Sequence, residues 1–297
     1  MKRLLKIVLV VLALVVVVGA YLLRAKQAPE HCAFTLDLPR LRELARSLPG
    51  ERPREIDVEK IVTLEMPEAV IYPGGALGLT TMSVYVYELA FPDRTIVIDT
   101  AMSAEDAKKS HASAFDAAAW TRAAAAIARA QAVYVTHEHC DHLGGLAALA
   151  PSLAPATVHL TAAQLAHLDL AKPVVFPASF AHELAPLVYD DLLAVAPGVV
   201  LVKAPGHTPG SQLVYVQLAD GRELILTGDT AWHRENVELV EGPPRLTSLL
   251  LKNDRAANAC QLQALHDLPA EVHVVPGHDA RVVDALVSAG LLHAGLR

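Results

Sequence analysis

The stretch "YVTHEHCDHLGG" at residues 134–145 decides the fold. Three histidines and an aspartate fall within six positions, directly after the strand-forming run "VYVT" at residues 133–136. The polar cluster therefore begins where a strand is predicted to end. Two interpretations are open at this point: a polar loop that happens to be rich in histidine, or half of a metal site. The rest of the sequence has to decide between them.

Three further strand patterns end on the same kinds of side chain. The stretch "VVLVKAPGHTPGS" carries His207, "LILTGDT" carries Asp229 and "VHVVPGHD" carries His278, each directly after a glycine. Ligands bind open α/β sheets at the carboxyl ends of their strands. Glycine lets the backbone approach closely there. A single histidine at a strand end is usually structural, but four such ends in one chain favour the metal site.

Seven side chains then share one chemistry, because imidazole and carboxylate groups are ligands of zinc, iron and manganese. The seven are His137, His139, Asp141, His142, His207, Asp229 and His278. Seven ligands are too many for one tetrahedral ion and match two. In a close pair of ions one carboxylate can bridge, and a shared water loses a proton near neutral pH. The sequence predicts two divalent metal ions, with zinc favoured and iron or manganese as alternatives, and a hydroxide nucleophile.

The order of these motifs resembles the metallo-β-lactamase fold superfamily. HxHxDH at 137–142 is followed by GHTPGS at 206–211, TGD at 227–229 and PGHD at 276–279, and the resemblance covers about residues 61–278. It implies an α/β fold, a four-layer αββα sandwich with the site at one edge of two facing sheets.

The resemblance also implies a role for each side chain. It divides the ligands between two ions: His137, His139 and His207 hold one, Asp141, His142 and His278 hold the other, and Asp229 bridges them. Asp141 and Asp229 are expected to act in catalysis, Asp141 by carrying a proton as well as binding metal. Asp99, which ends "TIVIDT", is expected to support the metal-binding loop without binding an ion. Glu138 and Cys140 occupy variable positions of the first motif and are expected not to be ligands.

Within the superfamily the sequence is most similar to the N-acyl homoserine lactonase-like branch, through "GDTAWHREN" and "GHD". The true zinc β-lactamases lack the bridging aspartate, the glyoxalase II enzymes add a helical C-terminal domain, and the flavodiiron proteins replace the histidine at position 139 by glutamate. The lactonase group has a tyrosine three residues after the bridging aspartate, whereas this chain has Trp232, whose indole donates one hydrogen bond but is not a phenol. Trp232 and the adjacent His233 are the candidate substrate-binding residues.

We therefore predict a dinuclear metal-dependent hydrolase that uses a metal-bridging hydroxide to cleave an ester, lactone or thioester of a small-molecule substrate. A β-lactam-hydrolysing metalloenzyme is the alternative, and a phosphodiesterase or nuclease on the same fold is the second alternative. The net charge of −7 argues against a nucleic-acid partner, because such partners need a basic surface. The oligomeric state is left open.

The N-terminal segment predicts a membrane helix. Basic residues precede an uncharged run of 17 residues at 7–23, about the minimum length for a membrane span. We predict a signal-anchor or transmembrane helix over residues 1–24, with a signal peptide that is cleaved before secretion as the alternative. The catalytic domain is expected on the extracytoplasmic (periplasmic) side.

The remaining chain is predicted to divide into two parts. Residues 25–55 are expected to form a linker with a short docking helix over 38–48, capped by Asp37, and residues 56–297 the metallo-β-lactamase-like hydrolase domain. An alanine-rich helix is expected over 112–130. The chain contains three scattered cysteines, and this odd number without CxxC spacing predicts no disulfide framework and leaves the redox compartment undetermined.

Overall fold

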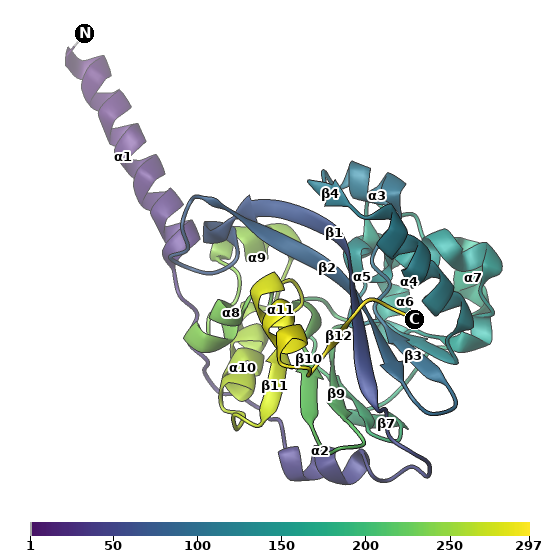
Figure 1. Ribbon diagram of the computed structural model, residues 1–297. Helices are drawn as coiled ribbons and strands as arrows, with labels where there is room; N and C mark the ends of the chain where they lie inside the picture. The colour runs from purple at the N-terminus through teal and green to yellow at the C-terminus, as the bar shows by residue number, and fades with distance from the viewer. Residues whose placement is uncertain (1) are drawn as a thin grey trace.

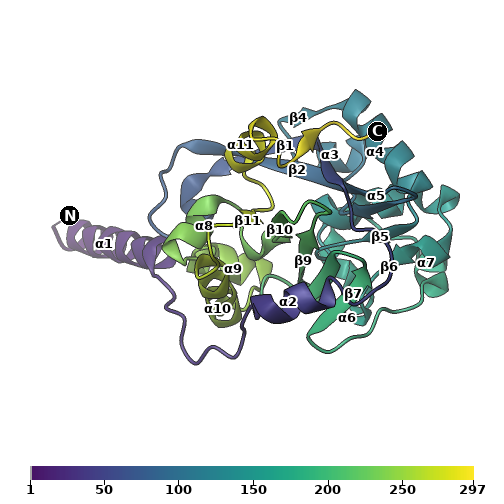
Figure 2. The same cartoon turned by 60° about the horizontal axis from the view of Figure 1, so that its bottom comes forward.

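Two β-sheets lie face to face in the centre of the molecule, and helices cover their outer faces (Figures 1 and 2). The computed structural model describes residues 2–297. The first sheet has the order β12-β1-β2-β3-β5-β6 with β4 beside β1, and its strands are β1 (Glu55–Pro67), β2 (Leu79–Ala90), β3 (Thr95–Ile98), β4 (Ala114–Phe115), β5 (Ala132–Tyr134), β6 (Val158–His159) and β12 (His293–Ala294). The second has the order β11-β10-β9-β8-β7, with β7 (Leu192–Ala196), β8 (Val199–Lys203), β9 (Gln212–Gln217), β10 (Glu223–Leu226) and β11 (Val272–Val275).

Side chains alternate between the two faces of each strand, and this alternation builds the layers. On β2, Tyr85 and Tyr87 pack into the core between the sheets, whereas Val84 and Val86 pack into an outer core with α4 (Ala117–Arg129). The second sheet likewise packs its outer face on other helices. The predicted αββα sandwich is confirmed.

The helices that flank the sheets are short. Besides α4 they are α2 (Leu38–Leu44), α3 (Ala104–Lys109), α5 (Cys140–Leu149), α6 (Ala162–Ala166), α7 (Ala178–Glu183), α8 (Arg234–Leu239), α9 (Arg245–Leu251), α10 (Arg255–His266) and α11 (Ala280–Ser288). α3, α4 and α5 pack on the first sheet, and α2 and α10 pack on the second.

Two helices differ from their predicted bounds, α4 at its start and α2 at its end. The alanine-rich helix was expected from residue 112, but Asp116 accepts hydrogen bonds from the backbone N–H groups of Ala118 and Ala119 and sets the start of α4. The residues before this cap form β4 instead. The docking helix begins after Asp37 as predicted, but α2 ends at Leu44, four residues earlier than predicted.

The apolar N-terminal segment is one helix, α1 (Lys2–Arg24), which projects from the body of the molecule (Figure 1). Its length of about 34 Å exceeds the hydrocarbon thickness of a bilayer. Residues 3–24 have the length and composition of a membrane span, and the most apolar 18 residues of this segment are not buried inside the protein. A signal sequence has the same properties, so the helix alone does not distinguish an anchor from a cleaved peptide.

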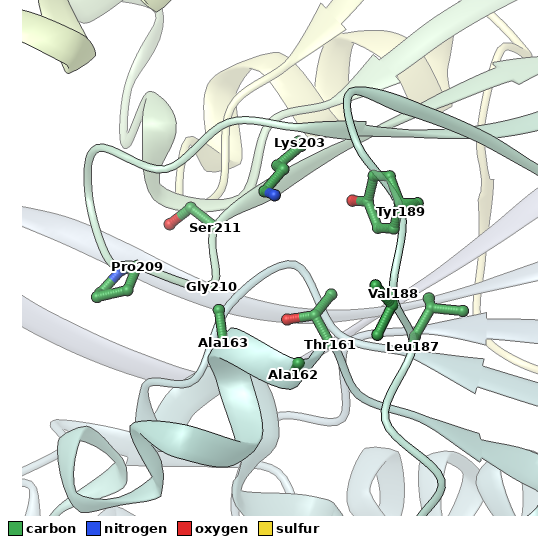
Figure 3. Close-up of a pocket in the computed structure, with 10 residues that line it drawn as sticks. All are labelled: Thr161, Ala162, Ala163, Leu187, Val188, Tyr189, Lys203, Pro209, Gly210 and Ser211. Carbon is green, nitrogen blue, oxygen red and sulfur yellow. The ribbon is translucent and has the colours of Figure 1, made fainter.

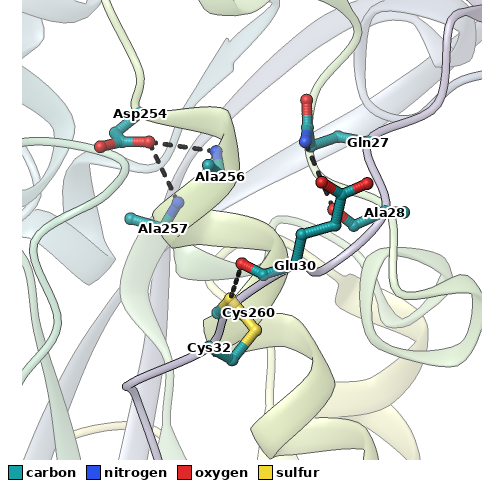
Figure 4. Close-up of a disulfide and its surroundings, with 8 residues drawn as sticks. All are labelled: Gln27, Ala28, Glu30, Cys32, Asp254, Ala256, Ala257 and Cys260. Atoms are coloured by element: carbon teal, nitrogen blue, oxygen red, sulfur yellow. Dashed lines mark hydrogen bonds between the residues drawn. A yellow bond between two sulfur atoms is a disulfide. The ribbon is translucent and has the colours of Figure 1, made fainter.

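One disulfide corrects the cysteine prediction. Cys32 and Cys260 are joined, which ties the segment after α1 to α10 (Figure 4). The two residues are 228 positions apart in sequence. A single bond over such a separation leaves no spacing pattern, and for this reason the sequence, which indicated only that no disulfide framework is present, did not reveal it. Cys140 carries a free thiol.

Candidate metal centre

The seven predicted ligands converge at one edge of the sandwich. They come from the loop after β5 and the start of α5, the loop after β8, the short 3-10 turn Gly228–Thr230 after β10, and the loop after β11. Candidate ligand atoms of His137, His139, His207 and Asp229 all lie within 4.8 Å of one another, and those of a second group, Asp141, His142 and His278, do the same. The first group contains the three histidines that the resemblance assigns to one ion, together with Asp229, and the second contains the three side chains that it assigns to the other.

The candidate ligand atoms of the first group lie close enough together to surround a single ion. His139 Nδ1 lies 3.1 Å from His137 Nε2 and 2.9 Å from His207 Nε2. Asp229 Oδ2 lies 3.3 Å from His207 Nε2 and 3.7 Å from His137 Nε2. A tetrahedral zinc ion with bonds of about 2.0–2.1 Å holds its ligand atoms roughly 3.3 Å apart. These four side chains therefore fit a single ion.

The second group uses the other oxygen of the same aspartate. Asp229 Oδ1 lies 2.9 Å from His278 Nε2 and 3.1 Å from His142 Nε2. Asp141 Oδ2 lies 3.5 Å from His278 Nε2 and 3.8 Å from His142 Nε2. Asp229 Oδ1 and His142 Nε2 are buried and make no hydrogen bond within the described residues. Buried polar atoms rarely remain without a partner, so this donor set fits a second cation.

Hydrogen bonds from outside the cluster orient two of the imidazoles. The Nδ1–H of His142 donates to Asp99 Oδ2 at 2.8 Å, and the Nδ1–H of His278 donates to the backbone carbonyl of Ser83 at 2.9 Å. Each bond fixes the ring with Nε2 turned toward Asp229, where a bound cation would take the place of a proton. Although burial opposes it, the facing carboxylates raise the pKa of His142 well above its ordinary value and also raise the pKa of His278.

Asp99 also holds the loop that carries the first motif. Its carboxylate accepts hydrogen bonds from the backbone N–H of Thr136 at 2.6 Å and from Thr136 Oγ1 at 2.8 Å. Its backbone adopts φ 60°, a left-handed conformation that costs free energy in a residue other than glycine. Asp99 therefore lies where the sequence placed it, behind the metal-binding loop.

Two glycines are required by the close approach of other segments around Asp229. Gly228 has φ +47°, and a Cβ there would lie 2.6 Å from the side chain of Thr136. A Cβ at Gly277 would lie 2.7 Å from the carbonyl oxygen of Gly228 and 2.9 Å from Asp229 Oδ1. The glycines that precede Asp229 and His278 in sequence thus keep the space in which the two ligands meet.

Burial sets the protonation of His137 and His139, and the facing imidazoles set the protonation of Asp229. Burial lowers the pKa of His137 well below its ordinary value and lowers the pKa of His139 to about 4, so both rings are neutral, as metal ligands must be. Burial also opposes ionisation of Asp229, but the facing imidazoles, His278 foremost, outweigh it and hold the pKa of this carboxyl well below its usual range. Asp229 is a carboxylate.

The variable positions of the first motif lie outside the two ligand groups. Glu138 is fully buried, and its carboxylate accepts hydrogen bonds from Thr208 Oγ1 at 2.8 Å and from the backbone N–H of Gly210 at 3.0 Å. It thereby ties the first metal-binding loop to the loop of His207, a function that the sequence did not reveal. Cys140 is half-buried and lies 3.9 Å from Ser110 Oγ, and burial raises the pKa of its thiol to about 12.

A cavity of about 250 Å³ opens beside the cluster. Polar and metal-binding side chains form one wall, and apolar side chains form the others; the lining residues include Leu64, Met66, Met82, Leu170, Lys172, Trp232 and Leu251. Trp232 is nearly buried, and its indole Nε1 has no hydrogen-bond partner among the described residues. His233 is not part of this lining, and its Nε2 lies 3.1 Å from the backbone carbonyl of Thr81.

A second, smaller cavity lies away from the centre, between the start of α6 and the loop that precedes β7 (Figure 3). Its lining includes Tyr189, Lys203 and Ser211, and it contains none of the seven candidate ligands.

Comparison with known proteins agrees with this geometry. Residues 77–278 match the family model described as the metallo-beta-lactamase superfamily. An N-acyl homoserine lactonase from Bacillus thuringiensis and a second from its subspecies kurstaki are each 31% identical over 105 residues, which is 35% of this chain and 39% of theirs. In these alignments the chain spans about two fifths of the length of the curated relatives.

Solved structures share the fold at low sequence identity. An N-acyl homoserine lactone hydrolase with the product N-hexanoyl-L-homoserine at its catalytic metal centre superposes with a TM-score of 0.59 at 16% identity, covering 79% of this chain and 96% of that chain. A dizinc quorum-quenching lactonase gives 0.54 at 15% identity, covering 76% and 88%. A probable metal-dependent hydrolase from Staphylococcus aureus gives 0.57 at 11% identity, covering 77% and 91%.

Proposed function

This chain belongs to the metallo-beta-lactamase superfamily, and from that premise we propose that it is a dinuclear metal-dependent hydrolase of a lactone, ester or thioester. The observation that carries the proposal is the position of Asp229. One of its oxygens faces His137 and His207, and the other faces His142 and His278. A carboxylate shared in this way belongs to a centre of two ions rather than one.

The ions, when bound, would polarise the substrate carbonyl and lower the pKa of a water held between them. The protein residues set the geometry for this chemistry. Asp229 holds the two ligand groups together, and Asp99 fixes the ring of His142. Asp141 is half-buried and lines the cavity, and we propose that its carboxylate carries a proton to the leaving oxygen.

The cavity supports an acyl substrate. Its walls are mainly apolar, and Trp232 lines it together with Asp229 and His278. The buried indole Nε1 of Trp232 has no hydrogen-bond partner among the described residues. We propose that this N–H donates to the carbonyl of the bound substrate, in the place where the lactonase-like branch has a tyrosine. The backbone contact of His233 makes it the weaker candidate of the two.

A substrate panel tests the proposed reaction. Acyl lactones, aryl esters, thioesters, a chromogenic cephalosporin and a bis-aryl phosphodiester are offered to the metal-loaded chain. We expect the lactones to have the highest kcat/KM, and Trp232→Phe to lower it about fivefold, since a neutral hydrogen bond contributes about 1 kcal/mol. Hydrolysis of the cephalosporin or phosphodiester in preference to every carbonyl ester would reject the lactonase assignment.

We also propose that α1 is retained as a signal anchor and holds the catalytic domain outside the cytoplasm. The disulfide between Cys32 and Cys260 supports a position outside the cytoplasm, because disulfides persist in oxidising compartments. A reporter enzyme that works only outside the cytoplasm, fused after Arg297, is expected to be active in cells. A silent reporter, or a mature chain that begins after residue 24, would contradict the anchored arrangement.

A further inference from the structure

α9 has an inverted distribution of polar and apolar side chains. Thr247 and Ser248 are buried, and their hydroxyls donate to the backbone carbonyls of Val70 and Pro243, both at 2.9 Å. Two of its leucines point outward instead: Leu249 is 69% exposed and Leu250 is 75% exposed. A surface helix normally buries its apolar face, so an outward apolar face indicates an apolar partner.

A second exposed apolar segment lies in the same region. Leu77, near the end of the loop that joins β1 to β2, is 80% exposed, and Leu79, the first residue of β2, is 67% exposed. In both Figure 1 and Figure 2 this loop and α9 lie beside the end of α1 that enters the body of the molecule. We refer to Leu77, Leu79, Leu249 and Leu250 as the leucine face.

The end of α1 is attached firmly to this region. α1 packs against α9, and the guanidinium of Arg245 lies 5.1 Å from the centre of the Tyr21 ring. Arg255 donates a hydrogen bond to the backbone carbonyl of Ala25 at 2.7 Å. The carboxylate of Glu241 accepts one from the backbone N–H of Gln27 at 3.2 Å. Because these contacts hold the exit of the helix, a bilayer that contains α1 would bring its surface to the leucine face.

Charges near the leucine face suit the headgroups of such a bilayer. Arg245 begins α9 and Lys252 follows it, so basic side chains flank the exposed leucines. Arg24 is the last residue of α1, the helix that packs against α9. Basic residues beside a membrane helix bind anionic lipids, and an aromatic residue such as Tyr21 is typical of the interface.

From these observations we propose that the leucine face docks into the surface of an anionic lipid bilayer. The inference rests on the proposed anchor. It also has a consequence for the substrate: Leu251, the last residue of α9, lines the cavity beside the metal centre. Docking therefore brings the apolar wall of this cavity to the lipid surface, where an amphiphilic substrate with an acyl chain would be concentrated.

The test measures contact with lipid at single positions in the full-length chain. Leu250→Cys is compared with Val188→Cys, an equally exposed position in the loop before β7, on the side away from α1 (Figures 1 and 2). Each variant carries an environment-sensitive fluorophore and is reconstituted into phosphatidylcholine–phosphatidylglycerol vesicles whose acyl chains bear spin labels. The unsubstituted chain gives the background from Cys140. We expect quenching at position 250 to exceed quenching at position 188 at least threefold.

Equal quenching at the two positions in chains that float with the vesicles would overturn the docking. So would a label at position 250 that is shielded equally in detergent and in vesicles, since that result means that a second copy of the chain covers the face. A chain that does not float would overturn the anchor and the docking together. The measurement needs neither metal nor turnover, so its failure is distinct from failure of the proposed hydrolase.

Discussion

Asp229→Ala is expected to lower kcat/KM for the best carbonyl substrate by about 10³-fold or more, because the variant removes a ligand from both proposed ions at once. Asp229 is nearly buried and supplies Oδ2 to one ligand group and Oδ1 to the other. No neighbouring carboxylate is placed to contact both groups among the described residues. The bound metal should fall from two ions per chain to one or fewer, measured by elemental analysis of the purified protein.

Two further variants serve as controls for Asp229→Ala. Asp116→Ala removes the N-cap of α4, and Asp116 belongs to neither ligand group. This variant should keep both ions and the full rate, while the free energy of unfolding falls by about 1 kcal/mol. Asp99→Asn keeps all seven ligands but weakens the support of His142, and should lower metal affinity about 10–100-fold. If Asp229→Ala hydrolysed substrate within about twofold of the unsubstituted chain, the dinuclear mechanism would be wrong.

Removal of the ions should abolish hydrolysis and destabilise the protein. The centre brings two carboxylates and five imidazoles to short range, and all of them except His139 and Asp141 are buried. Cations that bind the folded chain stabilise it by about 2.7 kcal/mol at a hundredfold excess over Kd. Dialysis against a chelator is therefore expected to lower Tm by roughly 5–10 °C, and addition of zinc, iron or manganese should restore both the Tm and the rate.

The Asp229→Ala chain is the matched control for chelation. With the bridge removed, the difference in Tm between chelated and zinc-loaded protein should shrink to less than half of that in the unsubstituted chain. A chelated protein that keeps its rate, or a Tm that does not respond to metal, would show that the cluster serves neither catalysis nor the fold.

The metal cluster could be predicted from the sequence because each ligand follows a strand pattern and, in three segments, a glycine. Such a pattern fixes where a side chain lies on a sheet edge even when the sheet order is unknown. Glu138 shows the limit of this reasoning. Its position in the motif identified it as a residue that does not bind metal, but its bonds to Thr208 and Gly210 depend on how two distant loops meet in space.

Contacts between distant segments account for the other features that the sequence did not show. The bond between Cys32 and Cys260 leaves no local signal. Ser83 orients His278 through a backbone carbonyl, a group that every residue has. The outward leucines of α9 look like core positions in sequence, because the buried partners of this helix are the polar Thr247 and Ser248. In each case tertiary structure decides what the local pattern leaves open.

Anomalous diffraction from crystals of the metal-loaded chain, recorded on both sides of the metal's absorption edge, tests the central claim most directly. We expect two peaks about 3.5–4 Å apart, the spacing of paired-metal hydrolytic sites. One should lie among His137, His139 and His207, the other among Asp141, His142 and His278, and Asp229 should contact both. A single peak, or two peaks that Asp229 does not join, would contradict the account.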